Sequence, residues 1–88
     1  MSNKPLLLIV DDDPLISDAL SYAFAAEFDV VTSHARPHCL ALLRQLRQAP
    51  QVALVDLGLP PQPHRPDEGF ALIGELLAHA PEMKIIVL

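Results

Sequence analysis

The stretch LLLIVDDDP at residues 6–14 decides the fold, because an uninterrupted apolar run meets a cluster of acids there. The run at residues 6–10 predicts a strand buried on both faces, as in the middle of a parallel sheet. Asp13 before Pro14 predicts a helix start, since aspartate caps free N–H groups and proline needs no N–H at the first position. The helix is expected over residues 14–26, with an apolar face formed by Leu15, Ile16, Ala19, Leu20, Ala23 and Phe24.

The remainder of the chain continues the alternation of short strands and helices. Further strands are predicted at 28–32, 52–57 and 84–88, and further helices at 37–48 and 68–79. The last helix is expected to bury Phe70, Ile73, Leu76 and Leu77. A proline-rich loop at residues 58–66 joins the strand at 52–57 to this last helix. Such alternation is typical of a parallel sheet with helices on both faces, so we predict one α/β domain over residues 1–88.

Composition excludes several classes of protein. The 88 residues allow one domain, and 51% apolar residues provide material for a core. The net charge of −5, with six scattered Lys and Arg residues, argues against direct nucleic-acid binding. A single Cys39 excludes a disulfide framework, and no apolar run reaches the roughly 18 residues of a membrane span. No signal-peptide core is present either, so a cytoplasmic protein without a membrane span is expected.

The aspartates stand where two strands end. Asp11, Asp12 and Asp13 follow the first strand, and Asp56 ends the third. If these strands are neighbours, the carboxylates share one pocket, and each like-charged pair at roughly 5 Å costs about 3 kcal/mol. Either one carboxyl stays protonated or a hard cation such as Mg²⁺ lies among them, with one carboxylate free to act as a nucleophile. We assign Asp13 to capping, and Asp12 and Asp56 together to function.

Residues 7–14 and 55–60 resemble the opening and the phosphoacceptor segment of response-regulator receiver domains. Asp56 follows Asp12 by 44 residues, a separation that suits the family. Residues 68–70 resemble the turn into its third helix, and residues 83–88 resemble its fourth strand. The resemblance implies a flavodoxin-like, three-layer α/β/α fold with a parallel sheet and strand order 2-1-3-4.

The resemblance also implies roles for particular residues. Asp56 would be the phosphoacceptor, and Asp11, Asp12 and Asp56 would bind Mg²⁺ together with the backbone carbonyl of Gly58. Pro60 would shape the loop that follows. The partners would be a sensor histidine kinase, which donates the phosphoryl group, and an attached output domain, which family analogy makes transcriptional. The chain would then be a phosphoacceptor rather than an enzyme.

Two features depart from the usual pattern of this family. The loop from Pro60 to Gly69 is long and resembles that of PEP-CTERM-box regulators, which carry a sigma-54-type AAA+ ATPase and a DNA-binding domain. The family's hydroxyl residue and Lys, which contact the phosphoryl group, would come after Leu88. We therefore expect the first two-thirds of a receiver, with the fifth strand missing. Such a piece, with an open edge at residues 85–88, is expected to dimerise, exchange elements or be largely unfolded.

Parts of the sequence are also compatible with two other functions and one other site. Asp11-x-Asp13 resembles the nucleophile motif of haloacid-dehalogenase-type phosphatases, although Pro14 stands where that family expects Gly. A degenerate receiver that acts only as a docking or dimerisation module is the other alternative. His34 and His38 have the spacing of a metal pair on a helix, but His34 is predicted to lie in the loop before it. We therefore expect no metal there, a core role for Cys39, and solvated loop positions for residues 64 and 65.

Overall fold

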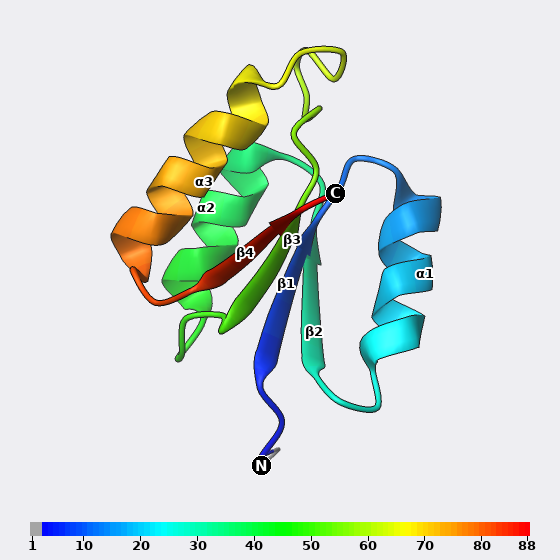
Figure 1. Ribbon diagram of the computed structural model, residues 1–88, viewed down its shortest axis with the longest axis vertical. Helices are drawn as coiled ribbons and strands as arrows, with labels where there is room; N and C mark the ends of the chain where they lie inside the picture. The colour runs from blue at the N-terminus through cyan, green and yellow to red at the C-terminus, as the bar shows by residue number, and fades with distance from the viewer. Residues whose placement is uncertain (1–2) are drawn as a thin grey trace.

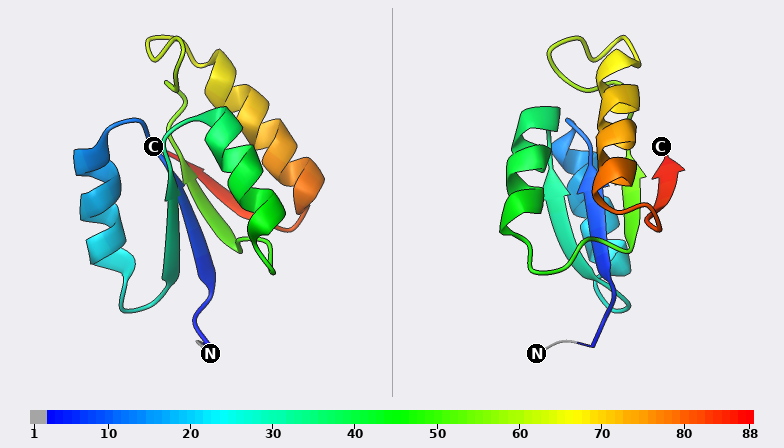
Figure 2. Two further views of the ribbon diagram at one scale, coloured as in Figure 1. Left: turned by 180° about the vertical axis from the view of Figure 1, so that it is seen from behind. Right: turned by 90° about the vertical axis from the view of Figure 1, so that its left-hand side faces the viewer.

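The computed structural model describes residues 3–88 as a parallel sheet between two helical layers (Figure 1). In chain order the elements are β1 (Leu6–Val10), α1 (Pro14–Phe24), β2 (Asp29–Ser33), α2 (Arg36–Gln45), β3 (Val52–Val55), α3 (Asp67–His79) and β4 (Lys84–Val87). The strand order is β2-β1-β3-β4. Helices α2 and α3 cover one face of the sheet, and α1 covers the other (Figures 1 and 2). The predicted α/β/α fold and its strand order are confirmed.

The register of β1 and β3 brings the acidic residues together. Val10 pairs with Val55, so Asp11 and Asp56 each follow a paired residue at the same edge of the sheet. The Asp56 N–H donates to the Val10 carbonyl at 2.8 Å, and the Asp11 N–H donates to the Ser33 carbonyl at 3.0 Å. These bonds extend the ladders past the strand ends and hold the backbone of both aspartates in place.

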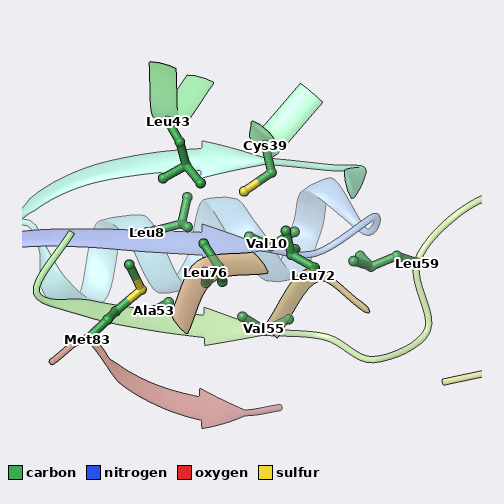
Figure 3. Packing of buried hydrophobic residues seen from close by; sticks show 10 residues of the cluster. All are labelled: Leu8, Val10, Cys39, Leu43, Ala53, Val55, Leu59, Leu72, Leu76 and Met83. Atoms are coloured by element: carbon green, nitrogen blue, oxygen red, sulfur yellow. The ribbon is translucent and has the colours of Figure 1, made fainter. Parts of the chain in front are cut away.

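The main core lies between the sheet and the pair α2 and α3. Apolar side chains from β1, β3, both helices and two connecting segments meet there (Figure 3): Leu8, Val10, Cys39, Leu43, Ala53, Val55, Leu59, Leu72, Leu76 and Met83. Cys39 is fully buried, and burial raises the pKa of its thiol to about 11, so it fills the core as predicted. Leu59, which the sequence placed in a loop, is also fully buried and anchors that loop to the core.

The buried face of α1 is narrower than predicted. Leu20 and Phe24 pack against a second cluster formed by Leu7, Ile9 and Leu54. The apolar face predicted for this helix is buried only in part, since Leu15 is 78% exposed, and Ile16, Ala19 and Ala23 are exposed too. The sheet covers one side of this helix, and a wide stripe extends beyond that side. Ser17 is buried in their place, and its hydroxyl donates to the Pro14 carbonyl.

Helix α3 packs Leu76 and Ile73 in the main core as predicted, but it is rotated away from the other two predicted residues. Its buried positions are Gly69, Leu72 and Leu76, whereas Phe70 is 59% exposed and Leu77 is also exposed. The rotation follows from Gly69, whose N–H donates to the Leu57 carbonyl at 3.2 Å. A Cβ at this position would meet the Leu57 carbonyl oxygen at 2.7 Å, so only glycine lets the helix come this close to the end of β3. The spacing of apolar residues in the sequence does not reveal this contact between Gly69 and Leu57.

Smaller differences concern the ends of elements. Helix α2 ends at Gln45 instead of residue 48, because Leu46 adopts an extended backbone and packs against the main core. Strand β2 begins at Asp29, while Phe28 lies outside it and makes an edge-on ring contact with Phe24 at 5.9 Å. Strand β3 ends at Val55, which leaves Asp56 outside the regular strand. These shifts leave the predicted topology unchanged.

Arg36 links α2 to α3. Its Nε donates to a Glu75 carboxylate oxygen at 2.6 Å, and its Nη1 donates to Glu68 at 3.2 Å. All three side chains are about one-third exposed, so the pairs are only partly screened by solvent.

We expect Arg36→Gln to lower the free energy of unfolding by about 0.5–1.5 kcal/mol, because two charge-assisted hydrogen bonds are lost. Arg44→Gln is the matched control, since Arg44 is exposed on the same helix, and its effect should stay within about 0.5 kcal/mol. Urea unfolding at low and high salt measures both. Equal effects of the two substitutions, or an Arg36 effect that grows with salt, would contradict this assignment.

Candidate functional site

Three carboxylates from two adjacent strands converge at one edge of the sheet. Oxygen atoms of Asp11, Asp12 and Asp56 all lie within 4.8 Å of one another, and we call this group the acid site. It lies at the carboxyl ends of β1 and β3, beside the start of α1 and the loop that leads to α3 (Figure 1). The predicted convergence of these three side chains is thus confirmed as geometry.

Asp11 is the most buried member of the acid site, with 6% of its surface exposed. Its Oδ1 accepts the Asp13 N–H at 2.9 Å, which fixes the side chain. Burial raises the pKa of the Asp11 carboxyl, and the charges of Asp56, Asp12 and Asp13 raise it further, while the Asp13 N–H works in the opposite direction. A cation bound next to Asp11 would therefore stabilise the ionised form of its carboxyl.

Asp56 is held by the glycine two residues further on. The Gly58 N–H donates to Asp56 Oδ1 at 3.0 Å, so one oxygen is fixed while the carboxylate keeps lone pairs for other partners. A Cβ at Gly58 would collide with the Pro63 carbonyl oxygen, so the loop folds this tightly only over a glycine. The predicted participation of the Gly58 carbonyl in metal binding stays a prediction.

Asp13 belongs to the helix rather than to the acid site. Its side chain accepts the Leu15 N–H at 2.9 Å, and its backbone is extended, as an N-cap requires. Its carbonyl also accepts the N–H groups of Ile16 and Ser17. The capping role predicted for Asp13 is therefore confirmed.

The donor set of the acid site fits a hard divalent cation. It consists of carboxylate oxygens, which are the ligands Mg²⁺ prefers, with no histidine or cysteine in the group. Without a cation, each ionised pair at 4.8 Å repels by about 3.5 kcal/mol at an effective dielectric constant near 20. The residues present therefore match the predicted Mg²⁺ site in type and in spacing.

A cavity of about 470 Å³, which we call the side cavity, opens next to the acid site. Asp11 and Asp12 form part of its wall, together with residues from the first turns of α1 and α2 and the end of β2. His34 and His38 also border it, and their ring centroids lie 4.7 Å apart. His34 does precede the helix, as predicted, but the loop still places its ring beside that of His38. The four-residue spacing was the signal for this pairing.

The polar residues of the long loop lie in solvent. His64 and Arg65 are exposed, as expected, and Arg65 Nε lies 3.4 Å from a carboxylate oxygen of Asp67.

The described residues include no helix with the length and hydropathy needed to cross a membrane.

The fold of this chain, rather than its sequence, relates it to known proteins. No protein-family model matches the chain, and no curated protein matches it by sequence. Solved structures do match. A CheY-like receiver domain protein from Methanospirillum hungatei JF-1 has a TM-score of 0.81 and 28% identity over 97% of this chain and 63% of its own. The BeF3-activated receiver domain of DrrB has a TM-score of 0.79 and 21% identity over 96% and 64%. DrrB is an OmpR/PhoB homologue from Thermotoga maritima.

A third match concerns a response regulator from Burkholderia pseudomallei, solved with a phosphorylated aspartic acid, a calcium ion and citrate. It has a TM-score of 0.80 and 24% identity over 96% of this chain and 46% of its own. The chain thus has the receiver-domain fold of two-component response regulators. It spans less than two-thirds of the length of the receiver structures it matches, namely 63% and 64% of the two named above.

Proposed function

We propose that this chain is a phosphoacceptor receiver, in which Asp56 takes a phosphoryl group from a sensor histidine kinase. The convergence of Asp11, Asp12 and Asp56 within 4.8 Å at the carboxyl ends of β1 and β3 carries this proposal. The receiver-domain fold of the solved structures supports it.

Each residue of the acid site would have its own role in phosphoryl transfer. Asp11 and Asp12 would hold Mg²⁺, with Asp56 and the Gly58 carbonyl as further ligands. When bound, this ion supplies positive charge next to the phosphoryl oxygens. The Gly58 N–H keeps the Asp56 carboxylate oriented, and the sheet edge fixes its backbone. A bound calcium ion in the Burkholderia pseudomallei structure is consistent with a cation at such a site.

The reaction uses one oxygen of Asp56 as the nucleophile. An O–P bond forms to that oxygen while the N–P bond of the kinase phosphohistidine breaks, and the released imidazole takes up a proton. The aspartyl phosphate adds negative charge at the strand edge, which shifts the equilibrium between two conformations of the receiver. The protein acts here as a phosphoacceptor, not as an enzyme that turns over an external substrate.

The phosphatase alternative finds less support in the structure. It requires the Asp13 carboxyl to face the reacting group beside Asp11, but that carboxyl caps α1. It also leaves the position of Asp56 unexplained. The docking-module alternative would need no acid site at all, so the three converging carboxylates favour the phosphoacceptor.

The proposal extends to partners outside the described residues. The long proline-rich loop supports a regulator of the PEP-CTERM-box type, with an attached AAA+ ATPase and DNA-binding domain as transcriptional output. A cytoplasmic location is part of this proposal. Homodimer formation stays a prediction.

The proposal is tested by phosphorylation of the complete protein with a small acyl phosphate and Mg²⁺. We expect the wild type to gain one phosphoryl group by mass spectrometry, and Asp56→Asn to gain none, because an amide oxygen is a poor nucleophile. Chelation of Mg²⁺ should also prevent labelling of the wild type.

Asp13→Asn is the matched control, since asparagine caps a helix as well as aspartate does. Under the receiver mechanism this variant is labelled like the wild type, whereas a phosphatase mechanism would require its carboxyl. Full labelling of Asp56→Asn at a residue outside the acid site would move the phosphoacceptor elsewhere.

A further inference from the structure

The side cavity carries chemistry that the acid site does not use. It lies between the start of α1, the end of β2 and the start of α2, and its wall includes Asp12, Ser17, Asp18, Ser33, His34 and His38. Two imidazoles and three carboxylates, the third being that of Asp11, thus border one space of about 470 Å³. Phosphoryl transfer at Asp56 gives no role to the histidines.

A hydrogen bond with Ser33 orients the ring of His38. The Ser33 hydroxyl has one proton, which it donates to the Ala35 carbonyl at 3.2 Å. Nδ1 of His38 lies 2.7 Å from the same oxygen, so Ser33 engages this nitrogen and leaves Nε2 for another partner. In the tautomer in which Nδ1–H donates to Ser33, Nε2 carries the lone pair. A histidine whose other nitrogen donates to an outer partner is the usual arrangement of a metal ligand.

His34 supplies a second imidazole beside the first. The ring centroids are 4.7 Å apart and the ring planes are inclined by 34°. Two nitrogens bound to one tetrahedral ion at 2.0–2.1 Å lie about 3.4 Å apart. Because His34 is an exposed loop residue, rotation of its side chain can bring one of its nitrogens to that distance from Nε2 of His38.

We propose that His34 and His38 bind a divalent transition-metal ion of the Zn²⁺, Ni²⁺ or Cu²⁺ class, next to the acid site but separate from it. Two coordination positions come from the imidazoles, and water in the side cavity completes the shell. The exposed carboxylate of Asp18 adds negative charge to the wall, which favours a cation. The proposal rests on the cavity and the histidine pair, and it is independent of the proposed phosphoacceptor function.

The two sites differ in the cation they select. The acid site offers oxygen ligands, which suit Mg²⁺, while the histidine pair offers nitrogen ligands, which suit the later first-row metals. Excess Mg²⁺ should therefore fill the acid site and leave the histidine pair to the transition metal. This selectivity allows the two sites to be measured separately.

The test is a titration of the complete, untagged protein with Cu²⁺ in excess Mg²⁺. Isothermal calorimetry measures the affinity, and electron paramagnetic resonance identifies the ligand atoms. We expect a spectrum with two nitrogen ligands at the site. The double variant H34Q/H38Q should bind at least about 100-fold more weakly, and Ser33→Ala about 10-fold more weakly, because Ser33 positions His38. The double variant H64Q/H79Q is the matched control and should bind as the wild type, since both residues are exposed outside the cavity.

The opposite results would overturn the proposal. Unchanged affinity in H34Q/H38Q would exclude the histidine pair, and so would displacement of Cu²⁺ by excess Mg²⁺ or a spectrum with oxygen ligands alone. Unchanged affinity in Ser33→Ala would overturn the positioning of His38. Both histidines are exposed, so circular dichroism of H34Q/H38Q should match the wild type and keep a loss of binding interpretable.

Discussion

Asp11→Asn should make the metal-free protein more stable, raising its free energy of unfolding by about 1–3 kcal/mol at neutral pH. The substitution removes a buried negative charge that lies within 4.8 Å of two others. It keeps the side-chain oxygen that accepts the Asp13 N–H. A change at a functional residue that stabilises the fold would show that the acid site is built for a ligand rather than for stability.

The pH dependence of this gain follows from the raised pKa of Asp11. In the folded wild type the carboxyl holds its proton above the unfolded value of 3.8. Its contribution to stability is complete below pH 3.8 and is lost as pH rises through the raised folded pKa. The advantage of Asp11→Asn over the wild type should therefore be small in acid and grow toward neutral pH.

Urea unfolding with a chelator and then with Mg²⁺ measures both effects. Mg²⁺ should stabilise the wild type and leave Asp11→Asn nearly unchanged, since binding to the folded state alone raises its stability. Glu82→Gln removes one exposed charge away from the acid site and should shift stability by less than about 0.5 kcal/mol. A metal-free Asp11→Asn protein less stable than the wild type would show that the carboxylate is already compensated.

Gly69→Ala should destabilise the fold by about 2–3 kcal/mol, as overpacking in a rigid position does. The added Cβ would meet the Leu57 backbone, with its carbonyl carbon at 2.9 Å and its carbonyl oxygen at 2.7 Å. Neither atom can move without shifting the end of β3, and α3 would lose the hydrogen bond from Gly69 N–H to Leu57. The result should be weaker Mg²⁺ binding as well, since Leu57 follows Asp56.

Gly74→Ala is the control within the same helix. A Cβ there meets nothing within 4 Å, so the substitution should stabilise by about 0.5–1 kcal/mol through the helix propensity of alanine. Thermal and urea unfolding of the two variants give their difference directly. If Gly69→Ala is as stable as Gly74→Ala, the contact between α3 and Leu57 does not control the rotation of the helix.

The topology and the acid site could be predicted because their signals are local. Apolar runs that stop at Asp11 and Asp56 mark the ends of buried strands, and parallel strands bring their carboxyl ends to one edge. Asp13 before Pro14 likewise predicts its own cap. In each case the prediction depends on the residue and on its immediate neighbours in the sequence.

The helix faces could not be predicted as well, because they depend on neighbours far away in sequence. Leu15 and Phe70 are as apolar as core residues, yet the sheet reaches neither of them. The rotation of α3 depends on Gly69, which has no hydrophobicity to reveal it. The side cavity depends on a loop conformation that places His34 beside His38.

The carbonyl of Leu57 accepts N–H groups from both Leu59 and Gly69, so it joins the two ends of the loop at its base. Leu59 is sealed in the core, whereas residues 61–66 are all exposed. The loop is therefore closed at its base by Leu57, and the Pro63 backbone packs on Gly58, while the side chains of residues 61–66 lie in solvent. Doubling the length of such a loop costs only about 0.6 kcal/mol of chain entropy. Insertions after Pro63 would leave its contact with Gly58 in place, so the chain can change in length there without moving Asp56.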